Sequence, residues 1–306
     1  MTVDVLTFGE TMAVLRAGTP GPLRLARSLD LAMAGAESTV AIGLSRLGHR
    51  VRWAGRVGAD EFGALIVERL RAEQVDTSFV HQDTEASTGL LVREQRTSDL
   101  ARVVYYRKGS AGSRLCPEDL RGPLADGAKV LLLSGIMPAL SETALAATRA
   151  ALDHAVDKRW VVCLDINHRT KLWSNQRATD ILTPLAARAT VVFGDQSELD
   201  LVGGVKALLD KGVREVVTKR GAQGAELTSP NGHWSSPAAP ATVVDVVGAG
   251  DAFVAGYLSG LLDALTPEER LTRATTVAAF AISTTGDWEG LPTRAELPHL
   301  TRDTIR

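Results

Sequence analysis

The sequence predicts an α/β fold with a mainly parallel central sheet, helices on both faces and a small separate β-sheet. Short runs of β-branched residues alternate with stretches of helical periodicity, which is typical of parallel sheets covered by helices. Two stretches have period-2 character without helices between them, which predicts an antiparallel flap apart from the main sheet. The length of 306 residues, of which 45% are apolar, suits one large domain of this class.

The main sheet is predicted from short apolar runs rich in valine, leucine and isoleucine. The predicted strands are residues 3–8, 51–57, 129–135, 160–166, 190–194 and 214–219. Helical spacing between them predicts helices over 37–48, 60–73, 141–158 and the segment after Gly194. The last third of the chain is predicted to be helical.

The flap is predicted from residues 11–34 together with the pair 88–94 and 102–107, so that lid strands cover about 11–34 and 88–108. No linker divides the chain, and residues 1–306 are predicted to form a single domain. Flaps beside open sheets often close over active sites.

Composition excludes several classes of function. The formal net charge is −2, so no basic field exists to hold nucleic acid. No apolar run reaches the roughly 18 residues that span a membrane, and the N-terminus lacks a signal-peptide pattern. Cys116 and Cys163 have no metal-ligand spacing. We expect a cytoplasmic protein with no nucleic-acid or membrane partner.

The segment VVDVVGAGDAFVAGYLSGLL (243–262) places an aspartate behind a glycine turn, at the start of a helix that is apolar nearly all round. Gly248, Ala249 and Gly250 would form the first turn, where free N–H groups and the helix dipole attract an anion. Asp251 is either a cap of a core helix or a base that faces a bound anion.

Phosphoryl transfer fits this turn, because backbone N–H groups neutralise phosphate charge while a carboxylate takes the proton of the attacking hydroxyl. The sequence contains no P-loop motif, and no G-x-G-x-x-G follows the first strand.

The segment DVVGAGDAF resembles the D-[ST]-x-G-A-G-D signature of the ribokinase-like (PfkB) carbohydrate kinases. The resemblance extends over nearly the whole chain, since residues 33–63 resemble the N-terminal signature of that family. Within the family, YYRKGSAGS (105–113) and LDINHRTKLW (164–173) are most similar to 2-keto-3-deoxygluconate kinases.

The resemblance implies a ribokinase-like fold and an ATP-dependent kinase that phosphorylates the terminal primary hydroxyl of 2-keto-3-deoxygluconate. It also implies Mg²⁺, a monovalent cation such as K⁺, and a homo-oligomer formed through the lid. A kinase for a neutral sugar of the fructokinase or ribokinase type is the alternative within the class. A sugar-binding regulator that has lost turnover is the alternative outside it.

The resemblance assigns roles residue by residue. Asp251 matches the catalytic base and Gly248–Gly250 match the anion hole. Gly35 matches the second glycine of a sugar-binding pair, and Asp245 matches an acid near a monovalent-cation site. Glu198, in DQSE, would organise hydrated Mg²⁺. Lys219, Gly221 and Gly224, in KRGAQG, would lie close to ATP.

Three positions depart from the family pattern. Ala34 replaces the first glycine of the pair and Thr39 replaces the usual asparagine, which affects contacts with sugar hydroxyls. Asp195 replaces an asparagine and adds negative charge near the metal. The base and the anion hole are kept.

Two arginines are candidates for binding a sugar carboxylate through bidentate hydrogen bonds. Arg107 ends a flap strand, and Arg169 follows a core strand, where open α/β sheets bind ligands. Without the family resemblance, the simpler interpretation is that each is a surface arginine that binds no ligand.

Of two neighbouring tyrosines, Tyr105 shares a strand face with Arg107 and is expected at the substrate, whereas Tyr106 would fill a core or an interface. Asp287 matches a position near substrate and cation, although an aspartate between glycines is often a turn residue. His168 is a weaker candidate for a base, because Asp251 already fills that role.

Overall fold

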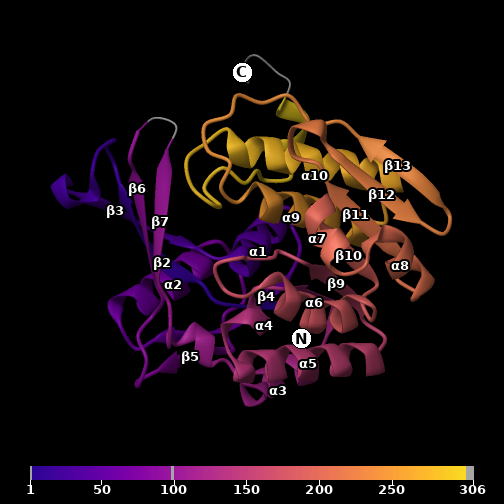
Figure 1. Cartoon of the computed structure of the whole chain (residues 1–306), viewed down its shortest axis with the longest axis horizontal. Helices are drawn as coiled ribbons and strands as arrows, with labels where there is room; N and C mark the ends of the chain where they lie inside the picture. Colours follow the sequence, from indigo (N-terminus) through magenta and orange to yellow (C-terminus); the bar gives the residue numbers. More distant parts are fainter. Residues whose placement is uncertain (1, 98–99, 301–306) are drawn as a thin grey trace.

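The computed structural model describes residues 2–97 and 100–300, and it contains two sheets and a set of flanking helices (Figure 1). The ends of the predicted single domain, residue 1 and residues 301–306, lie outside the described residues, as do residues 98–99 within the second predicted lid segment.

The main sheet has nine strands in the order β13-β12-β11-β10-β9-β8-β1-β4-β5. The strands are β1 (Val3–Phe8), β4 (Val51–Gly58), β5 (Val80–Asp83), β8 (Ala128–Ser134), β9 (Val161–Asp165), β10 (Val191–Gly194), β11 (Glu215–Lys219), β12 (Ala225–Ser229) and β13 (Gly232–Ser236). All neighbouring pairs from β5 to β11 are parallel, whereas β12 and β13 add antiparallel strands at one edge.

Helices cover both faces of this sheet. They are α1 (Ala36–Arg46), α2 (Glu61–Ala72), α3 (Arg121–Asp126), α4 (Met137–Leu140), α5 (Glu142–Asp157), α6 (Asn175–Ala186), α7 (Gln196–Leu201), α8 (Gly204–Asp210), α9 (Ala249–Leu262) and α10 (Pro267–Ile282). Alternate residues of β8 enter two different cores. Leu131 and Leu133 pack with the side that holds α5 and α6, whereas Val130 and Leu132 pack with the side that holds α1, α9 and α10.

The second sheet is the predicted lid. Its strands are β2 (Met12–Ala17), β3 (Leu29–Ala34), β6 (Leu90–Gln95) and β7 (Ala101–Tyr106), in the order β3-β2-β6-β7. It forms a separate layer at the left of Figure 1. The sheet is mixed, because β2 and β6 pair in parallel, so the prediction of an antiparallel flap was wrong at this central pairing.

The six predicted strands of the main sheet are confirmed to within one residue at each end. The prediction of a helical last third was wrong at residues 225–236, where β12 and β13 form a hairpin. These strands lie at the sheet edge and contain polar residues, so they lack a strong apolar run. The turn between them, Ser229-Pro230-Asn231-Gly232, was a readable hairpin signal. Within the described part of the chain, no helix is long and apolar enough to cross a membrane.

Candidate active site

The start of α9 forms a turn that glycine alone fits at its first position. Gly248 is the N-cap residue and has a φ of 76°, in the left-handed region. A Cβ atom at Gly248 would lie 2.2 Å from the backbone oxygen of Asp287. The turn therefore needs glycine for its backbone angle and for the close approach of the 286–287 segment.

Gly250, two residues later, has open space beside it. The nearest heavy atom to a Cβ placed there is Nζ of Lys219, at 3.8 Å. Residues 248–251 are partly exposed, although residues 252–260 of the same helix are buried. The positive end of a buried helix is thus open to a ligand beside a lysine ammonium group, which is a favourable place for phosphate.

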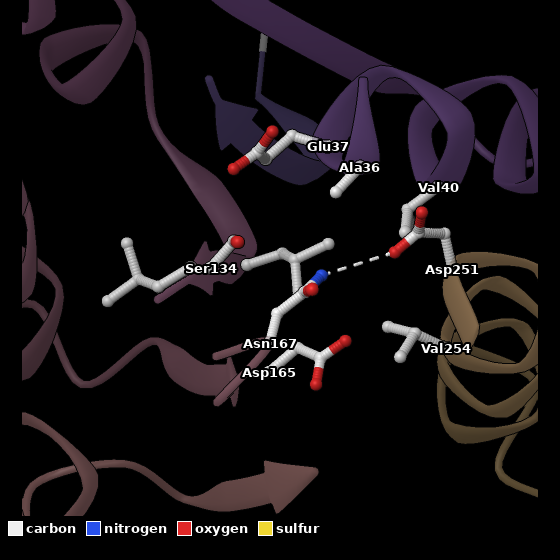
Figure 2. Close-up of a pocket in the computed structure, with 10 residues that line it drawn as sticks. Ala36, Glu37, Val40, Ser134, Asp165, Asn167, Asp251 and Val254 are labelled. Carbon is white, nitrogen blue, oxygen red and sulfur yellow. Dashed lines mark hydrogen bonds between the residues drawn. The ribbon is translucent and has the colours of Figure 1, made fainter. Parts of the chain in front are cut away.

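Asp251 lies in the first turn of α9 and borders a small pocket (Figure 2). The pocket encloses about 10 Å³, the room of a single water molecule. Glu37, Ser134, Asp165 and Asn167 also line it. Oδ1 of Asp251 accepts a long hydrogen bond of 3.4 Å from the Asn167 side chain. These groups come from α1, α9 and the ends of β8 and β9.

Burial raises the pKa of Asp251, while the positive charges of Arg169 and Lys219 act in the opposite direction. Asn167 holds a φ of 40°, a conformation that asparagine tolerates better than most residues. Such a backbone angle next to a carboxylate is typical of functional sites.

Lys219 ends β11 and faces two carboxylates. Its Nζ lies 2.7 Å from Oδ1 of Asp165 and 3.9 Å from Oε2 of Glu198. Burial lowers the pKa of Lys219, but the charges of Asp165 and Glu198 outweigh it and raise the pKa above its usual value. The lysine therefore carries its charge at neutral pH.

Glu198 is fixed by backbone donors on both oxygens. Oε1 accepts from the His168 N–H and Oε2 from the Asp195 N–H, each at 2.8 Å. The Asp195 carboxylate in turn accepts from the Glu198 N–H, which makes a capping box at the start of α7. Asp195 therefore has a structural role that an asparagine would also fill.

Two further glycines of the predicted nucleotide side lie in the turn between β11 and β12. Gly221 has a φ of 54° and Gly224 a φ of 90°. A Cβ at Gly224 would lie 2.0 Å from the Ser236 oxygen, whereas Gly221 has open space.

On the lid side, Arg107 is held by Glu10. Nε of Arg107 donates to Oε2 of Glu10 at 2.7 Å, and Ser110 donates to the other oxygen. The guanidinium lies over the ring of Tyr105, at 5.7 Å, and Nζ of Lys171 lies at 5.7 Å from the same ring. Tyr105 and Arg107 therefore lie together, as predicted, and Lys171 joins them from the loop after β9.

Arg169 is exposed in that same loop. Gly35 is the N-cap of α1, and a Cβ there would lie 2.7 Å from the Glu10 backbone oxygen. Ala34 and Thr39, the two nearby residues that depart from the family pattern, are both buried. Oγ1 of Thr39 has no hydrogen-bond partner in the described chain.

Asp287 lies against the glycine turn, and burial followed by the nearby charge of Asp251 raises its pKa to about 7. Asp245 is paired with a lid arginine, Arg93.

Several site residues were not among the sequence predictions: Glu10, Glu37, Arg93, Asp165, Asn167 and Lys171. Glu37 offered a signal, since it is the one ionisable residue of the segment AESTVAIG, at the start of a predicted helix. Glu10, directly after the first strand and a glycine, occupies the sheet edge where ligands bind. Arg93 offered none, because its partner is 152 residues away in the chain.

Comparison with known proteins identifies the fold and the class of enzyme. The sequence profile of the pfkB family carbohydrate kinases matches residues 3–294. A 2-dehydro-3-deoxygluconokinase of Bacillus subtilis is 34% identical over 307 residues, which cover 97% of this chain and 95% of the relative. A 2-dehydro-3-deoxygalactonokinase of Haloferax volcanii is 32% identical over 297 residues, which cover 94% and 93%.

A solved structure of a PfkB protein from a Polaromonas species superimposes with a TM-score of 0.88 at 36% identity. The match covers 97% of this chain and 99% of that one. The ribokinase-like fold expected from the sequence is thereby confirmed. The chain belongs to the pfkB family, and it is an ATP-dependent carbohydrate kinase.

Proposed function

We propose that the substrate is 2-keto-3-deoxygluconate and that the enzyme phosphorylates its terminal primary hydroxyl with ATP. The observation that carries the sugar-acid assignment is the group of cations at the mouth of the site. Arg107 and Lys171 approach the Tyr105 ring from the lid and from the core, and Arg169 lies two residues before Lys171. The names of the two relatives described above support a keto-deoxy sugar acid.

A carboxylate is the group that such cations would recognise. Removing a carboxylate from water costs several kcal/mol unless positive charge and hydrogen bonds replace the water. Glu10 takes the Nε side of Arg107, which leaves Nη1 for a ligand. Lys171 and Arg169 supply two more donors of positive charge from the core side.

Asp251 acts as the general base in this proposal. It takes the proton of the sugar hydroxyl as the hydroxyl oxygen bonds to the γ-phosphorus and the bond to ADP breaks. Burial raises the pKa of Asp251 and so increases its basicity. The positive charges of Arg169 and Lys219 act against this rise in pKa and favour the ionised carboxylate, the form that can accept the proton.

The backbone of the glycine turn, together with Lys219, would hold the phosphates. Backbone N–H groups of Gly248–Asp251 and the ammonium of Lys219 would stabilise the charge on the transferred group. The open space beside Gly250 supports this role, because nothing in the described chain fills it within 3.8 Å. Gly221 and Gly224 would let the β11–β12 turn approach the nucleotide.

The residues present fit a hydrated Mg²⁺ bound mainly through ATP. No cluster of three metal-binding side chains occurs in residues 2–97 and 100–300, so a cage made by protein alone does not form there. Mg²⁺ usually keeps several waters and takes one or two carboxylates together with phosphates. Glu198, fixed by two backbone N–H groups, would accept hydrogen bonds from those waters. Bound there, Mg²⁺ would neutralise phosphate charge.

A coupled kinase assay tests the proposed function. The panel contains 2-keto-3-deoxygluconate, its galactonate epimer, fructose and ribose, with the Asp251→Asn variant as the inactive control. We expect the keto-deoxy acids to have the highest kcat/KM, and the variant to lose kcat by about 10²–10⁴.

Preference for fructose or ribose would assign the enzyme to the neutral-sugar kinases. Sugar binding without any turnover in the wild type would favour a regulator. Near-normal turnover of Asp251→Asn would return Asp251 to a capping role.

The proposal includes a homo-oligomer formed through the lid. Strand register places Leu31, Leu15, Val92 and Val104 on one face of the lid, opposite to the face that carries Arg93 and Tyr105. Leu31 and Val104 on that outer face are exposed, as is Tyr106. A second copy of the chain would cover them.

A further inference from the structure

One ion pair joins the lid to the loop that leads into α9. Arg93 lies in the lid strand β6, and Asp245 lies three residues before the glycine turn. Nη1 of Arg93 is 2.6 Å from Oδ2 of Asp245, and Nη2 is 3.1 Å from Oδ1. The Asp245 side chain is 4% exposed and the Arg93 side chain 17%. This is a bidentate and largely buried pair, the geometry in which arginine–carboxylate pairs are strongest.

Four donors surround the Asp245 carboxylate. Besides the two Arg93 contacts, Oδ1 accepts from the Val247 N–H at 3.2 Å and Oδ2 from the Gly286 N–H at 3.3 Å. Although burial raises the pKa of Asp245, the bonds from Arg93 and these backbone groups lower it below the usual value. The carboxylate is therefore ionised and its oxygens are already engaged.

These contacts do not fit the monovalent cation that the resemblance places near Asp245. K⁺ needs oxygen ligands, and here a guanidinium group supplies the positive charge at both oxygens. A second cation beside it would meet like charge at close range in a partly buried site.

Asp245 connects two segments that together shape the anion-binding turn. Val247 directly precedes Gly248 in the chain, and Gly286 directly precedes Asp287. The backbone oxygen of Asp287 packs against Gly248 so closely that a Cβ there would lie 2.2 Å away. The position of the Asp245 carboxylate thus affects the geometry of the first turn of α9.

We propose that Arg93 is the built-in cation of this site and a positioning residue for the anion-binding turn. Its charge fixes Asp245 when the lid is closed, so lid closure and correct formation of the turn occur together. The kinase therefore needs no added monovalent cation for turnover. This inference rests on the proposed function of the turn at Gly248–Asp251.

The size of the effect follows from the pair that would be lost. Removing Arg93 leaves a buried carboxylate without its charged partner, and hydrogen bonds to charged groups contribute enough to change an equilibrium by about 10–100-fold. We expect Arg93→Met to lower kcat by about 10–100-fold, with a smaller change in the KM for the sugar. Arg93→Lys keeps the charge and should retain most of the activity.

The test compares the wild type, Arg93→Met, Arg93→Lys and the control Arg102→Met. Arg102 is also a lid arginine, but it belongs to the outer face, its side chain is 74% exposed and its partner Glu94 is 3.8 Å away. Each variant is assayed at constant ionic strength in choline chloride, NaCl and KCl. We expect K⁺ to change the activity of the wild type and of Arg102→Met by less than about twofold, because Arg93 is present in both. The exposed Arg102 pair should itself contribute little.

For Arg93→Met we expect K⁺ to restore part of the lost activity more effectively than choline, because a small cation can enter the vacated place. A purely structural role of Arg93 would give the same loss of activity in all three salts. A wild type that K⁺ activates tenfold or more would overturn the proposal.

Hydrogen exchange of the lid strands provides a readout that does not depend on turnover. We expect β6 and β7 to exchange faster in Arg93→Met than in Arg102→Met, with each variant measured at the same interval below its own melting temperature. Equal exchange in the two variants would overturn the proposal that the Arg93–Asp245 pair couples the lid to the turn. If Arg93→Met does not fold, Asp245→Asn combined with Arg93→Lys in a double-mutant cycle tests the same coupling, and strict additivity would contradict it. A wild type that phosphorylates no sugar would refute the proposed function while leaving the exchange result meaningful.

Discussion

Three carboxyls line the small pocket at the start of α9, and two of them, Asp251 and Glu37, differ in their partners. Asp251 accepts a hydrogen bond from Asn167 and is affected by two cations. Glu37 is fully buried, and its Oε1 has no hydrogen-bond partner in the described chain. Burial raises the pKa of Glu37 to about 8, so this carboxyl is neutral at pH 7 and does not repel the Asp251 carboxylate.

The raised pKa of Glu37 predicts how stability depends on pH. The folded protein holds the proton more tightly than the unfolded chain, so this group's contribution is complete below pH 4.5 and is lost as the pH rises through about 8. Between pH 5.5 and 9 the wild type should lose about 3 kcal/mol more unfolding free energy than Glu37→Gln. Urea unfolding at both pH values measures it.

The control for that experiment is Glu142→Gln, because Glu142 also lies in a first helical turn but its side chain is 77% exposed. An equal pH dependence in the wild type and in both variants would mean that Glu37 is ionised in the folded protein.

Arg107 and Arg169, the two arginines of the proposed carboxylate site, give a prediction on substrate specificity. Arg169→Ala should lower kcat/KM for the keto-deoxy acid by about 10–100-fold, because charge-assisted hydrogen bonds contribute about 1.5–3 kcal/mol. Activity on fructose should change much less. Arg169 is exposed, whereas Arg107→Ala also leaves the buried Glu10 without its ion-pair partner.

Steady-state kinetics on both sugars measure the effect. Arg107→Ala should show the same preference together with a lower melting temperature. Equal losses on the acid and on fructose would show that the arginines act on the fold or on the nucleotide.

At the scale of one element, glycine occurs at two positions at the start of α9 for different physical reasons. Gly248 is required by its left-handed backbone and its contact with Asp287, whereas Gly250 has open space toward Lys219. The first is a folding constraint. The second leaves room for a ligand.

Substitutions should separate these two roles. Gly250→Val should keep the melting temperature within a few degrees and lower kcat by about 10–1000-fold, since it blocks access to the backbone donors. Gly248→Ala should lower the unfolding free energy, because a Cβ cannot fit against the Asp287 oxygen. Thermal unfolding and kcat are measured on both. Normal turnover of a folded Gly250→Val would exclude phosphate from this turn.

Elements with a strong apolar period could be predicted from the sequence, and short or polar ones could not. The strands β8 and β9 contain continuous runs of four apolar residues, as expected for strands buried on both faces. β5 has four residues, Val80–Asp83, of which three are polar, so its position beside β4 decides its structure.

The predictions for the site divide in the same way. Groups within one motif, such as Gly248–Asp251, were predicted, whereas Arg93 and Glu10 depend on contacts between distant segments. Nothing local in the sequence encodes those contacts.

At the scale of the whole molecule, the inner face of the lid carries Arg93, whereas its outer face exposes apolar side chains beside the pair Glu94–Arg102. If a second copy of the chain covers the outer face, the double variant Leu31→Asp, Tyr106→Asp should dissociate the oligomer. Leu31 and Tyr106 are 49% and 64% exposed in the single chain. Charged groups cannot be buried in an apolar interface without partners. Light scattering after gel filtration measures the mass against the 32.5 kDa of one chain.

Val156→Asp is the control, since Val156 is an exposed residue of α5, which packs on the main sheet rather than in the lid. A wild type with the mass of one chain would contradict the lid interface.

The strand order of the main sheet bears on how the protein is made. From β9 to β13 each strand lies beside the one that precedes it in the chain, so the sheet can grow outward from β8 as the ribosome delivers each segment. The lid strands β6 and β7, which precede residue 107, are synthesised before most of that growth. Asp251 emerges only after β13, with the helix that packs against α1. A nascent chain would thus carry its lid, Arg107 and Arg169 well before it acquires Asp251, the base of the proposed mechanism, and under that mechanism no partly synthesised kinase would turn over.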